Sequence, residues 1–288
     1  MRIPYYPMVA TIQIATGSNL LRPSGVTPTP RSPMSPRSKA TTRVAATTRV
    51  ARDGASSPSP EAENEILARI SAAERAAIME HAEEVEYPLR HDMFEQGDSI
   101  DRVYFPITGM ASLVIVLHDG TTVEALTVGR EGFIGLPLLN QVKTARYKGI
   151  CQIEGKFLVL DANAFLSVID DLPDLLRRLL RYAQYSSEVA AQSAACNSVH
   201  SVEQRCARWL LVTSDAIGTR MFNLTQEFLS QMLAVRRPGV TVTMAALAKR
   251  DLISYKYRNV TLLDVPALEK VSCECYATIR EKARELLS

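Results

Sequence analysis

The chain has 288 residues, of which 47% are hydrophobic and 22% are charged, and its formal net charge is +2. This length leaves room for two domains of ordinary size, and the composition is typical of a soluble globular protein. The sequence contains no apolar run close to the roughly 18–20 residues of a membrane span, which argues against an integral membrane protein.

Charge is distributed unevenly along the chain. Residues 1–52 contain basic but no acidic residues, residues 53–195 carry a net charge of −10, and residues 196–288 carry +4. An acidic segment is repelled by the phosphates of nucleic acids, whereas a basic segment is attracted. A contact with nucleic acid is therefore expected in the last third of the chain.

Residues 1–60 are predicted to form a disordered basic tail. They are rich in Pro, Ser, Thr and Arg and contain the pentapeptide TTRVA twice. Such a composition buries too little apolar surface to offset the entropy lost on ordering. A translation start at Met34 and an organelle transit peptide are the alternatives for this segment.

A domain built mainly from short strands is predicted over residues 61–172. Its first part, about 65–83, has a helical pattern in which Ser71 and Glu74 form a capping box. Strands are expected at 103–106, 111–117, 122–128 and 156–160, and Asp119-Gly120 predicts a type I′ hairpin turn. Short strands at this spacing favour a small sandwich or barrel.

A long helix is predicted over residues 173–197, beginning at Pro173. Apolar and then small side chains follow a spacing of three and four residues along it, which is typical of a seam between paired helices. We therefore expect a homodimer, the alternative being that this face packs on the chain's own barrel. The seam consists of Leu176, Leu179, Ala183, Ser186, Ala190, Ser193 and Asn197.

Residues 198–288 are predicted to form a winged helix-turn-helix domain. A helix over 201–215 comes first, and Thr225 then caps a short helix with an apolar face. Pro238 begins a second helix, the recognition helix, after a tight break. Two strands on either side of Lys256–Asn259 predict a basic wing. The residues expected at DNA are Thr225, Gln226, Arg236, Arg237, Gly239, Thr241, Thr243 and Lys256.

The sequence resembles the CRP/FNR family of bacterial transcription regulators over about residues 65–280. The resemblance is carried in the barrel by Gly97-Asp98, Val103–Pro106 and Gly129–Gly135, and most strongly afterwards by Ala194–Asn197, His200–Leu211 and Thr225–Thr243. It implies an α+β fold with a jelly-roll-like, cyclic-nucleotide-binding-type sensor barrel, a dimerisation helix and a winged helix-turn-helix. It also implies a homodimer that binds near-palindromic double-stranded DNA and contacts RNA polymerase.

The candidate effector pocket departs from the cyclic-nucleotide binders that this family includes. Those proteins have a Gly-Glu pair and an Arg followed by Ser or Thr, whereas here Leu136 follows Gly135 and Tyr147 follows Arg146. A buried phosphate needs paired donors, so we expect that cyclic AMP is not the effector. The sequence leaves the effector open, including the case in which there is none.

Cysteines and histidines are expected to have structural roles. The five cysteines are an odd number without a secretory signal, which indicates a reduced, cytoplasmic setting. Cys196 with His200, and Cys273 with Cys275, each offer too few ligands for a metal. No metal site and no cofactor are therefore predicted, with redox sensing as the alternative.

The function expected from the sequence is a cytoplasmic, sequence-specific transcription regulator. The sequence shows no nucleophile motif or phosphate-binding loop, so an enzyme is not expected. The alternative function is a small-ligand sensor whose C-terminal domain contacts proteins instead of DNA.

Overall fold

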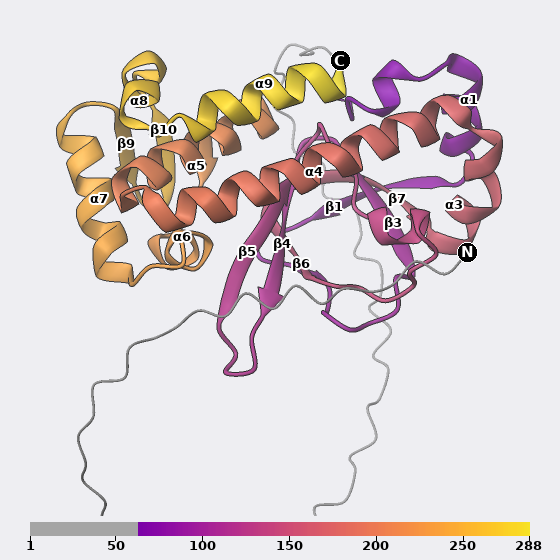
Figure 1. Cartoon of the computed structure of the whole chain (residues 1–288), viewed down its shortest axis with the longest axis horizontal. Coiled ribbons are helices and arrows are strands. Elements are labelled where there is room, and N and C mark those ends of the chain that lie inside the picture. Colours follow the sequence, from indigo (N-terminus) through magenta and orange to yellow (C-terminus); the bar gives the residue numbers. More distant parts are fainter. Residues whose placement is uncertain (1–62) are drawn as a thin grey trace, which may run out of the picture. The chain divides into compact units, whose positions relative to one another are not determined.

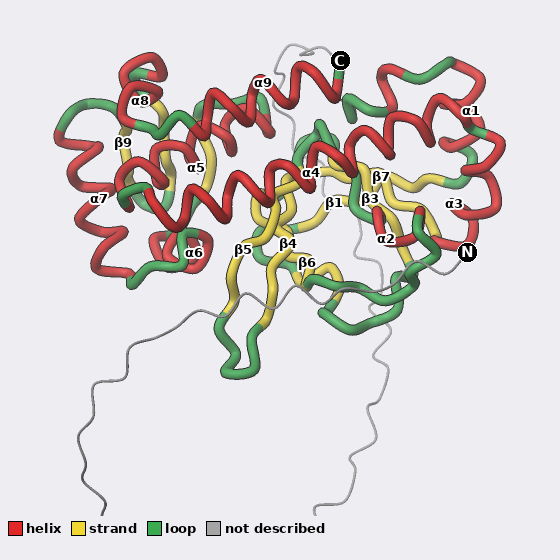
Figure 2. The backbone as a smooth tube through the Cα atoms, in the orientation of Figure 1, coloured by secondary structure: helices red, strands yellow, loops and turns green. Residues whose placement is uncertain are grey.

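The computed structural model describes residues 63–288, and the tail predicted at 1–60 lies outside this range. Strands are concentrated in the first half of the described chain, and helices occupy most of the second half (Figures 1 and 2). Among residues 63–288, no helix has both the length and the apolar character that a bilayer crossing requires.

The β domain (residues 82–161) consists of two antiparallel sheets, with strand orders β1-β7-β3 and β2-β6-β4-β5. The strands that the sequence predicted correspond to β3, β4, β5 and β7, whereas β1, β2 and β6 were not predicted as separate strands. The bounds are β1 (Ala82–Tyr87), β2 (Asp92–Phe94), β3 (Arg102–Pro106), β4 (Met110–Val116), β5 (Thr122–Val128), β6 (Lys148–Ile153) and β7 (Gly155–Asp161).

Two local predictions in this region are corrected. The helical segment predicted to about residue 83 consists of a 3-10 turn η1 (Leu67–Arg69) and a helix α1 (Ala72–Met79). It ends at Met79, and β1 begins at Ala82. In the hairpin between β4 and β5, Gly120 has φ +83° but Asp119 has no positive φ. A type I′ turn needs positive φ at both central residues, so the turn is of another type.

The helix α4 (Pro173–Val199) confirms the predicted long helix. Ser71 caps α1 as expected, but the Glu74 carboxylate reaches α4 instead of completing a capping box. It accepts hydrogen bonds from the backbone N–H groups of Asp174 at 3.0 Å and Leu175 at 2.8 Å. These N–H groups lack partners within the first turn of a helix, so Glu74 fixes the start of α4 on α1.

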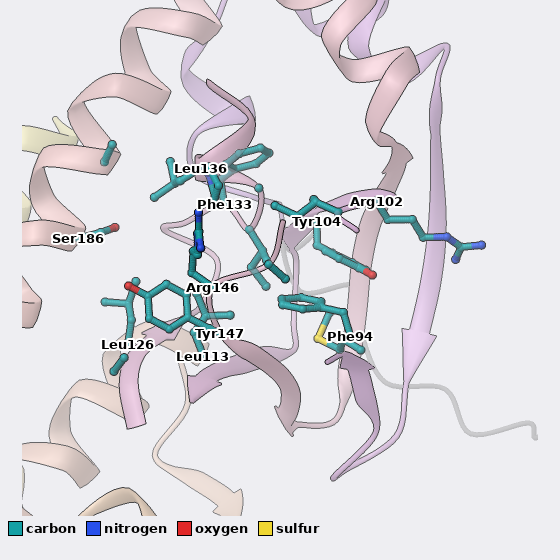
Figure 3. A pocket seen from close by; sticks show the side chains of 18 of the residues that line it. Phe94, Arg102, Tyr104, Leu113, Leu126, Phe133, Leu136, Arg146, Tyr147 and Ser186 are labelled. Atoms are coloured by element: carbon teal, nitrogen blue, oxygen red, sulfur yellow. The ribbon is translucent and has the colours of Figure 1, made fainter. Parts of the chain in front are cut away.

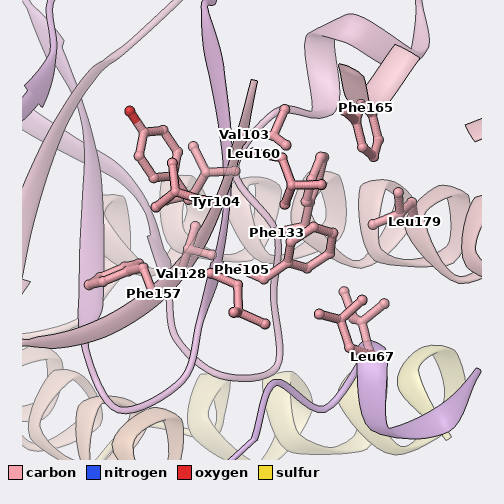
Figure 4. Packing of buried hydrophobic residues seen from close by; sticks show 14 of the residues in the cluster. Leu67, Val103, Tyr104, Phe105, Val128, Phe133, Phe157, Leu160, Phe165 and Leu179 are labelled. Carbon is pink, nitrogen blue, oxygen red and sulfur yellow. The ribbon is translucent and has the colours of Figure 1, made fainter. Parts of the chain in front are cut away.

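The hydrophobic core joins the β domain to α4 (Figure 4). The rings of Phe105 and Phe133 are 4.8 Å apart, and those of Phe133 and Phe165 are 5.3 Å apart, with Phe165 in the helix α3 (Ala162–Val168). A 3-10 turn η2 (Ile169–Asp171) connects α3 to α4. Leu179 of α4 is fully buried in this core.

The dimer seam predicted from the sequence is therefore partly wrong. Leu179 is 0% exposed and Ser186 is 7% exposed, because both face the core of their own chain. Leu176 and Ala183 are half-buried, and Ala190 is exposed. The predicted seam residues that remain accessible share a face of α4 with Leu180. This residue follows the buried Leu179 and is 53% exposed.

The winged-helix domain (residues 202–288) contains a three-stranded sheet with the order β8-β10-β9, and helices surround it. Its last helix lies along α4 (Figure 1), where Arg181 donates a hydrogen bond to the carbonyl of Glu285 at 2.6 Å. The elements are α5 (Val202–Ile217), β8 (Met221–Asn223), α6 (Gln226–Met232), α7 (Arg237–Lys249), β9 (Ile253–Lys256), β10 (Asn259–Leu262), α8 (Val265–Val271) and α9 (Cys275–Leu287).

Candidate DNA interface and effector pocket

The helices α6 and α7 form the predicted helix-turn-helix. Thr225 is the N-cap of α6, where its hydroxyl accepts a hydrogen bond from the N–H of Phe228 at 3.1 Å. The connection contains Ala234 at φ +49°, and α7 then begins at Arg237, directly before Pro238. Val240 and Leu247 are fully buried, so they fix one face of α7 against the domain.

The outer face of α7 differs from the sequence prediction at one residue. Arg237, Gly239 and Thr241 are exposed as expected. Thr243 is only 8% exposed, because it lies three residues after Val240 and so shares the buried face. Val242, which was not among the predicted contact residues, is instead 70% exposed on the outer face.

Polar contacts hold the start of α7 against α6. The Thr241 hydroxyl donates a hydrogen bond to Gln226 Oε1 at 2.7 Å. A guanidinium nitrogen of Arg237 lies 3.9 Å from the Glu227 carboxylate, with the Arg237 side chain 66% exposed. This pair is long and exposed, so it contributes little to stability and leaves Arg237 available to another anion.

Thr225 has a second partner outside the domain. Arg90, in the turn between β1 and β2, donates a hydrogen bond to the Thr225 hydroxyl at 2.6 Å. The hydroxyl therefore accepts bonds from both Phe228 and Arg90, which gives Thr225 a positioning role at the start of α6.

The wing confirms the predicted β-hairpin. Its two-residue turn consists of Tyr257 and Arg258, at φ +50° and +72°, as a type I′ turn requires. Lys256 and Arg258 are exposed, and Tyr257 is 97% exposed. The Tyr255 hydroxyl anchors the wing by donating to the carbonyl of Leu224 at 3.2 Å. We call Arg236, Arg237, Thr241, Lys256 and Arg258 the recognition surface.

A cavity of about 770 Å³ lies between the β domain and α4 (Figure 3). It contains both residues that the sequence predicted for an effector pocket, Gly135 and Arg146. Gly135 has φ +145°, and a Cβ there would lie 2.6 Å from Val103 and 2.7 Å from Phe133, so only glycine fits. Most of the wall is apolar, including Phe94, Leu113, Leu126, Phe133, Leu136 and Ala183.

Two arginines line this cavity, but they are oriented differently. The Arg102 side chain is directed away from Arg146 and Tyr147 (Figure 3), and its Nη1 lies 3.9 Å from the Glu83 carboxylate. Arg146 therefore supplies the guanidinium that faces the cavity beside Tyr147. The cavity has the size of a small-molecule site, but Tyr147 follows its inward-facing arginine in place of the Ser or Thr expected for a cyclic phosphate. The other polar groups of its wall include the carboxylates of Asp98 and Asp101 and the hydroxyls of Ser186 and Ser187.

A half-buried carboxyl group on β5 is hydrogen-bonded to α5. Glu124 accepts hydrogen bonds from the Ser112 hydroxyl at 2.9 Å and from Trp209 Nε1 at 3.1 Å. Burial raises the pKa of Glu124 to about 7, although both hydrogen bonds and Arg208 oppose the shift. Burial also raises the pKa of Glu131 to about 7. We therefore expect the hydrogen bond between Glu124 of β5 and Trp209 of α5 to depend on pH near neutrality.

Two family models match the described chain. A cyclic nucleotide-binding domain matches residues 84–171, and a Crp-like helix-turn-helix domain matches residues 204–271. A CRP-like cAMP-activated global transcriptional regulator from Mycobacterium tuberculosis is 24% identical over 220 residues, which cover 72% of this chain and 98% of that protein.

Solved structures show the same fold. A CRP-family transcriptional regulator from Thermus thermophilus has a TM-score of 0.56 at 22% identity, covering 65% of this chain and 96% of that one. The c-di-GMP-responsive global regulator CLP from Xanthomonas campestris has a TM-score of 0.56 at 17% identity, covering 67% and 100%. The chain belongs to the CRP/FNR family, as a transcriptional regulator with a cyclic nucleotide-binding domain and a helix-turn-helix DNA-binding domain.

Proposed function

We propose that this regulator acts in the cytoplasm as a homodimer on near-palindromic double-stranded DNA, and that it contacts RNA polymerase there. The observation that carries the proposal is the recognition surface, which presents Arg236 and Arg237 at the start of α7 and two further cations on the wing. A helix whose N-terminal residues enter the major groove reads base edges, while cations beside it neutralise phosphates. The contact with RNA polymerase rests on family membership alone.

The exposed face of α4 supports the homodimer. Its residues follow alternating spacings of four and three, the pattern of a two-helix seam, and Leu180 is a large apolar side chain with 53% exposure. Two copies joined along this face would present two recognition helices, which fits an operator with two related halves. The residues of this corrected seam are Leu176, Leu180, Ala183, Ser187, Ala190 and Ala194.

The effector would bind in the cavity beside this seam. Ala183, Ser187 and Ala190 belong both to the cavity wall and to the corrected seam, so a bound molecule would lie against the dimer contact. Arg146 favours a small molecule with one anionic group, and the apolar wall favours an apolar body. The relatives differ in the ligand that their descriptions print, cAMP for one and c-di-GMP for another, so family membership does not identify the effector.

Selection of bound duplexes from a random pool, followed by binding at several salt concentrations, tests the proposal. Neutralising phosphates releases counterions, so the logarithm of the association constant should fall linearly with the logarithm of the salt concentration. The selected sequence should have two related halves. A chain that contacts proteins instead would select no sequence and show no such slope on DNA, and that result would overturn the proposal.

A further inference from the structure

Four potential metal ligands meet where α4 ends. Cys196 lies in the last turn of α4, and His200 is the residue that ends this helix. Cys273 and Cys275 lie on either side of Glu274, at the junction between α8 and α9. Far apart in the sequence, the three Sγ atoms and a ring nitrogen of His200 all lie within 4.8 Å of one another. Each pair alone has too few ligands, but the fold brings four together, so the reason for predicting no metal site fails.

Two of the ligand-to-ligand distances match a tetrahedral metal site. The Sγ atoms of Cys196 and Cys273 are 3.5 Å apart, and Cys275 Sγ lies 3.7 Å from His200 Nδ1. Zinc binds sulfur at about 2.3 Å and nitrogen at about 2.0–2.1 Å, which places the ligand atoms of a tetrahedron roughly 3.5–3.8 Å apart. A disulfide needs sulfur atoms about 2.05 Å apart, so this pair is spaced for a shared ion instead.

The surroundings of the cluster also suit a metal. The second ring nitrogen of His200, Nε2, lies 3.2 Å from the Glu274 carboxylate, which would orient the ring with Nδ1 toward the sulfur atoms. Carboxylates commonly hold metal-bound histidines in this way. Gln192 Nε2 donates to Cys275 Sγ at 3.1 Å, as a hydrogen bond to a thiolate would. Cys196, Cys273 and Cys275 are 0%, 3% and 1% exposed.

We propose that Cys196, His200, Cys273 and Cys275 bind one Zn²⁺ ion as a structural site. Three thiolates and one imidazole form a closed set of four ligands, the arrangement of structural zinc rather than catalytic zinc. Thiolate and imidazole donors favour zinc over magnesium, calcium or manganese. The ion would tie the break between α4 and α5, at His200 and Ser201, to the junction between α8 and α9. It would thereby hold the winged-helix domain at a fixed angle to α4.

Metal analysis of the full-length protein, purified under reducing conditions without added metal, tests this site. We expect one zinc atom per chain by mass spectrometry of the elements. Replacing zinc with Co²⁺ should give the strong visible bands of a tetrahedral ion and a thiolate-to-cobalt charge-transfer band. These readouts use the unaltered chain and do not depend on DNA binding.

Variants then assign the ligands. Cys196→Ser and Cys273→Ser should each lower the zinc content and weaken the charge-transfer band. Cys206→Ser is the matched control, because Cys206 is also fully buried but lies on α5 against Met244. It should keep one zinc. His200→Cys should keep the metal and strengthen the charge-transfer band, which separates loss of a ligand from loss of the fold.

Three results would overturn the proposal. The chain could contain no metal and give only the weak spectrum of octahedral Co²⁺. Its mass could be lower by two hydrogen atoms because Cys196 and Cys273 form a disulfide. It could also contain iron in place of zinc at the same stoichiometry.

Discussion

The recognition surface and the effector cavity differ in what they offer to a ligand. The recognition surface exposes four cations to water, where phosphates can be neutralised at little desolvation cost. The cavity is lined mainly by apolar side chains, and its polar residues include the exposed Arg146 and the carboxylates of Asp98 and Asp101. DNA binding therefore depends mainly on charge neutralisation, whereas binding in the cavity depends mainly on burial of apolar surface. Changes to packed or shared faces should have larger effects than changes to single exposed cations.

The largest effect is expected from the dimer seam. Leu180→Glu combined with Ala190→Glu places like charges on both sides of the corrected seam, so the protein should become monomeric by analytical sedimentation. A monomer loses the effective concentration of the second recognition helix, and binding to a full operator should weaken by about 100- to 10,000-fold. Gln184→Glu, on an exposed part of α4 outside the seam, is the control. A double variant that stays dimeric would show that α4 is not the dimer contact.

The burial of α4 shows what sequence periodicity can and cannot determine. The bounds of α4, the N-cap at Thr225 and the wing were predictable, because Pro173, a capping hydroxyl and a short polar turn are local signals. Leu179 and Leu180 are both apolar, so the sequence alone did not show which of them faces the chain's own core. Only the packing of the β domain decides this, and it buries Leu179.

Other sites were missed because they depend on long-range or neighbouring contacts. The strand β1 contains three glutamates, all of them exposed, so it lacks the apolar signal of a core strand. Thr243 has the chemistry of a DNA contact but the position of a core residue. The four proposed zinc ligands come from two segments of the sequence that only the fold brings together.

Ionisation of Glu124 is expected to lower the free energy of unfolding by about 3 kcal/mol as the pH rises. The reason is that its pKa is raised to about 7 in the folded chain from an ordinary value of 4.5. The folded chain favours the neutral carboxyl. Its contribution to stability is therefore complete below about pH 4.5 and is lost as the pH rises through about 7.

Urea unfolding at several values between about pH 5 and pH 8 measures this effect. The unfolding free energy of the unaltered chain should fall with increasing pH. Glu124→Gln should reduce the fall, and adding Glu131→Gln should remove most of the remainder, because Glu131 shares the raised pKa. An unchanged slope in Glu124→Gln would mean that this carboxyl is already ionised in the folded chain.

Arg237→Ala tests base reading by the recognition surface. A guanidinium at the start of α7 can bond guanine O6 and N7 together, so its loss should cost about 1–3 kcal/mol on the selected operator and relax the preference at one base pair in each half. Arg177→Ala is the matched control, since the Arg177 side chain is 67% exposed and also pairs with a nearby carboxylate, that of Asp174. Equal weakening on selected and random duplexes would make Arg237 a phosphate contact.

Lys256→Ala should have a smaller effect of another kind. A wing cation that contacts phosphate carries no sequence information, so binding to all duplexes should weaken by a similar factor. The slope of binding against salt should decrease by roughly one unit. Lys156→Ala, which removes an exposed cation from β7, is the control and should leave the slope unchanged. If the loss of affinity were confined to the selected operator, Lys256 would contact a base instead of a phosphate.

Cyclic AMP should have no effect at all, although the Mycobacterium tuberculosis relative is described as cAMP-activated. The cavity of about 770 Å³ has room for a nucleotide, so size does not exclude it. The polar groups do. With Leu136 after Gly135, the ribose hydroxyls lack the carboxylate partner that the family's nucleotide binders supply at this position, and each buried hydroxyl without a partner costs about 1–3 kcal/mol. The carboxylates that line the cavity, those of Asp98 and Asp101, lie in the segment before β3 instead. With Tyr147 after Arg146, the phosphate lacks the short hydroxyl donor next to the arginine, and the serines that line the cavity, Ser186 and Ser187, lie on α4. Titration calorimetry at millimolar cAMP should therefore show no saturable heat for the unaltered chain.

Leu136→Glu combined with Tyr147→Ser restores both groups and should gain cAMP binding if the missing contacts are the cause. Micromolar binding by the unaltered chain would show that Arg146 and the apolar wall are sufficient to hold a cyclic nucleotide.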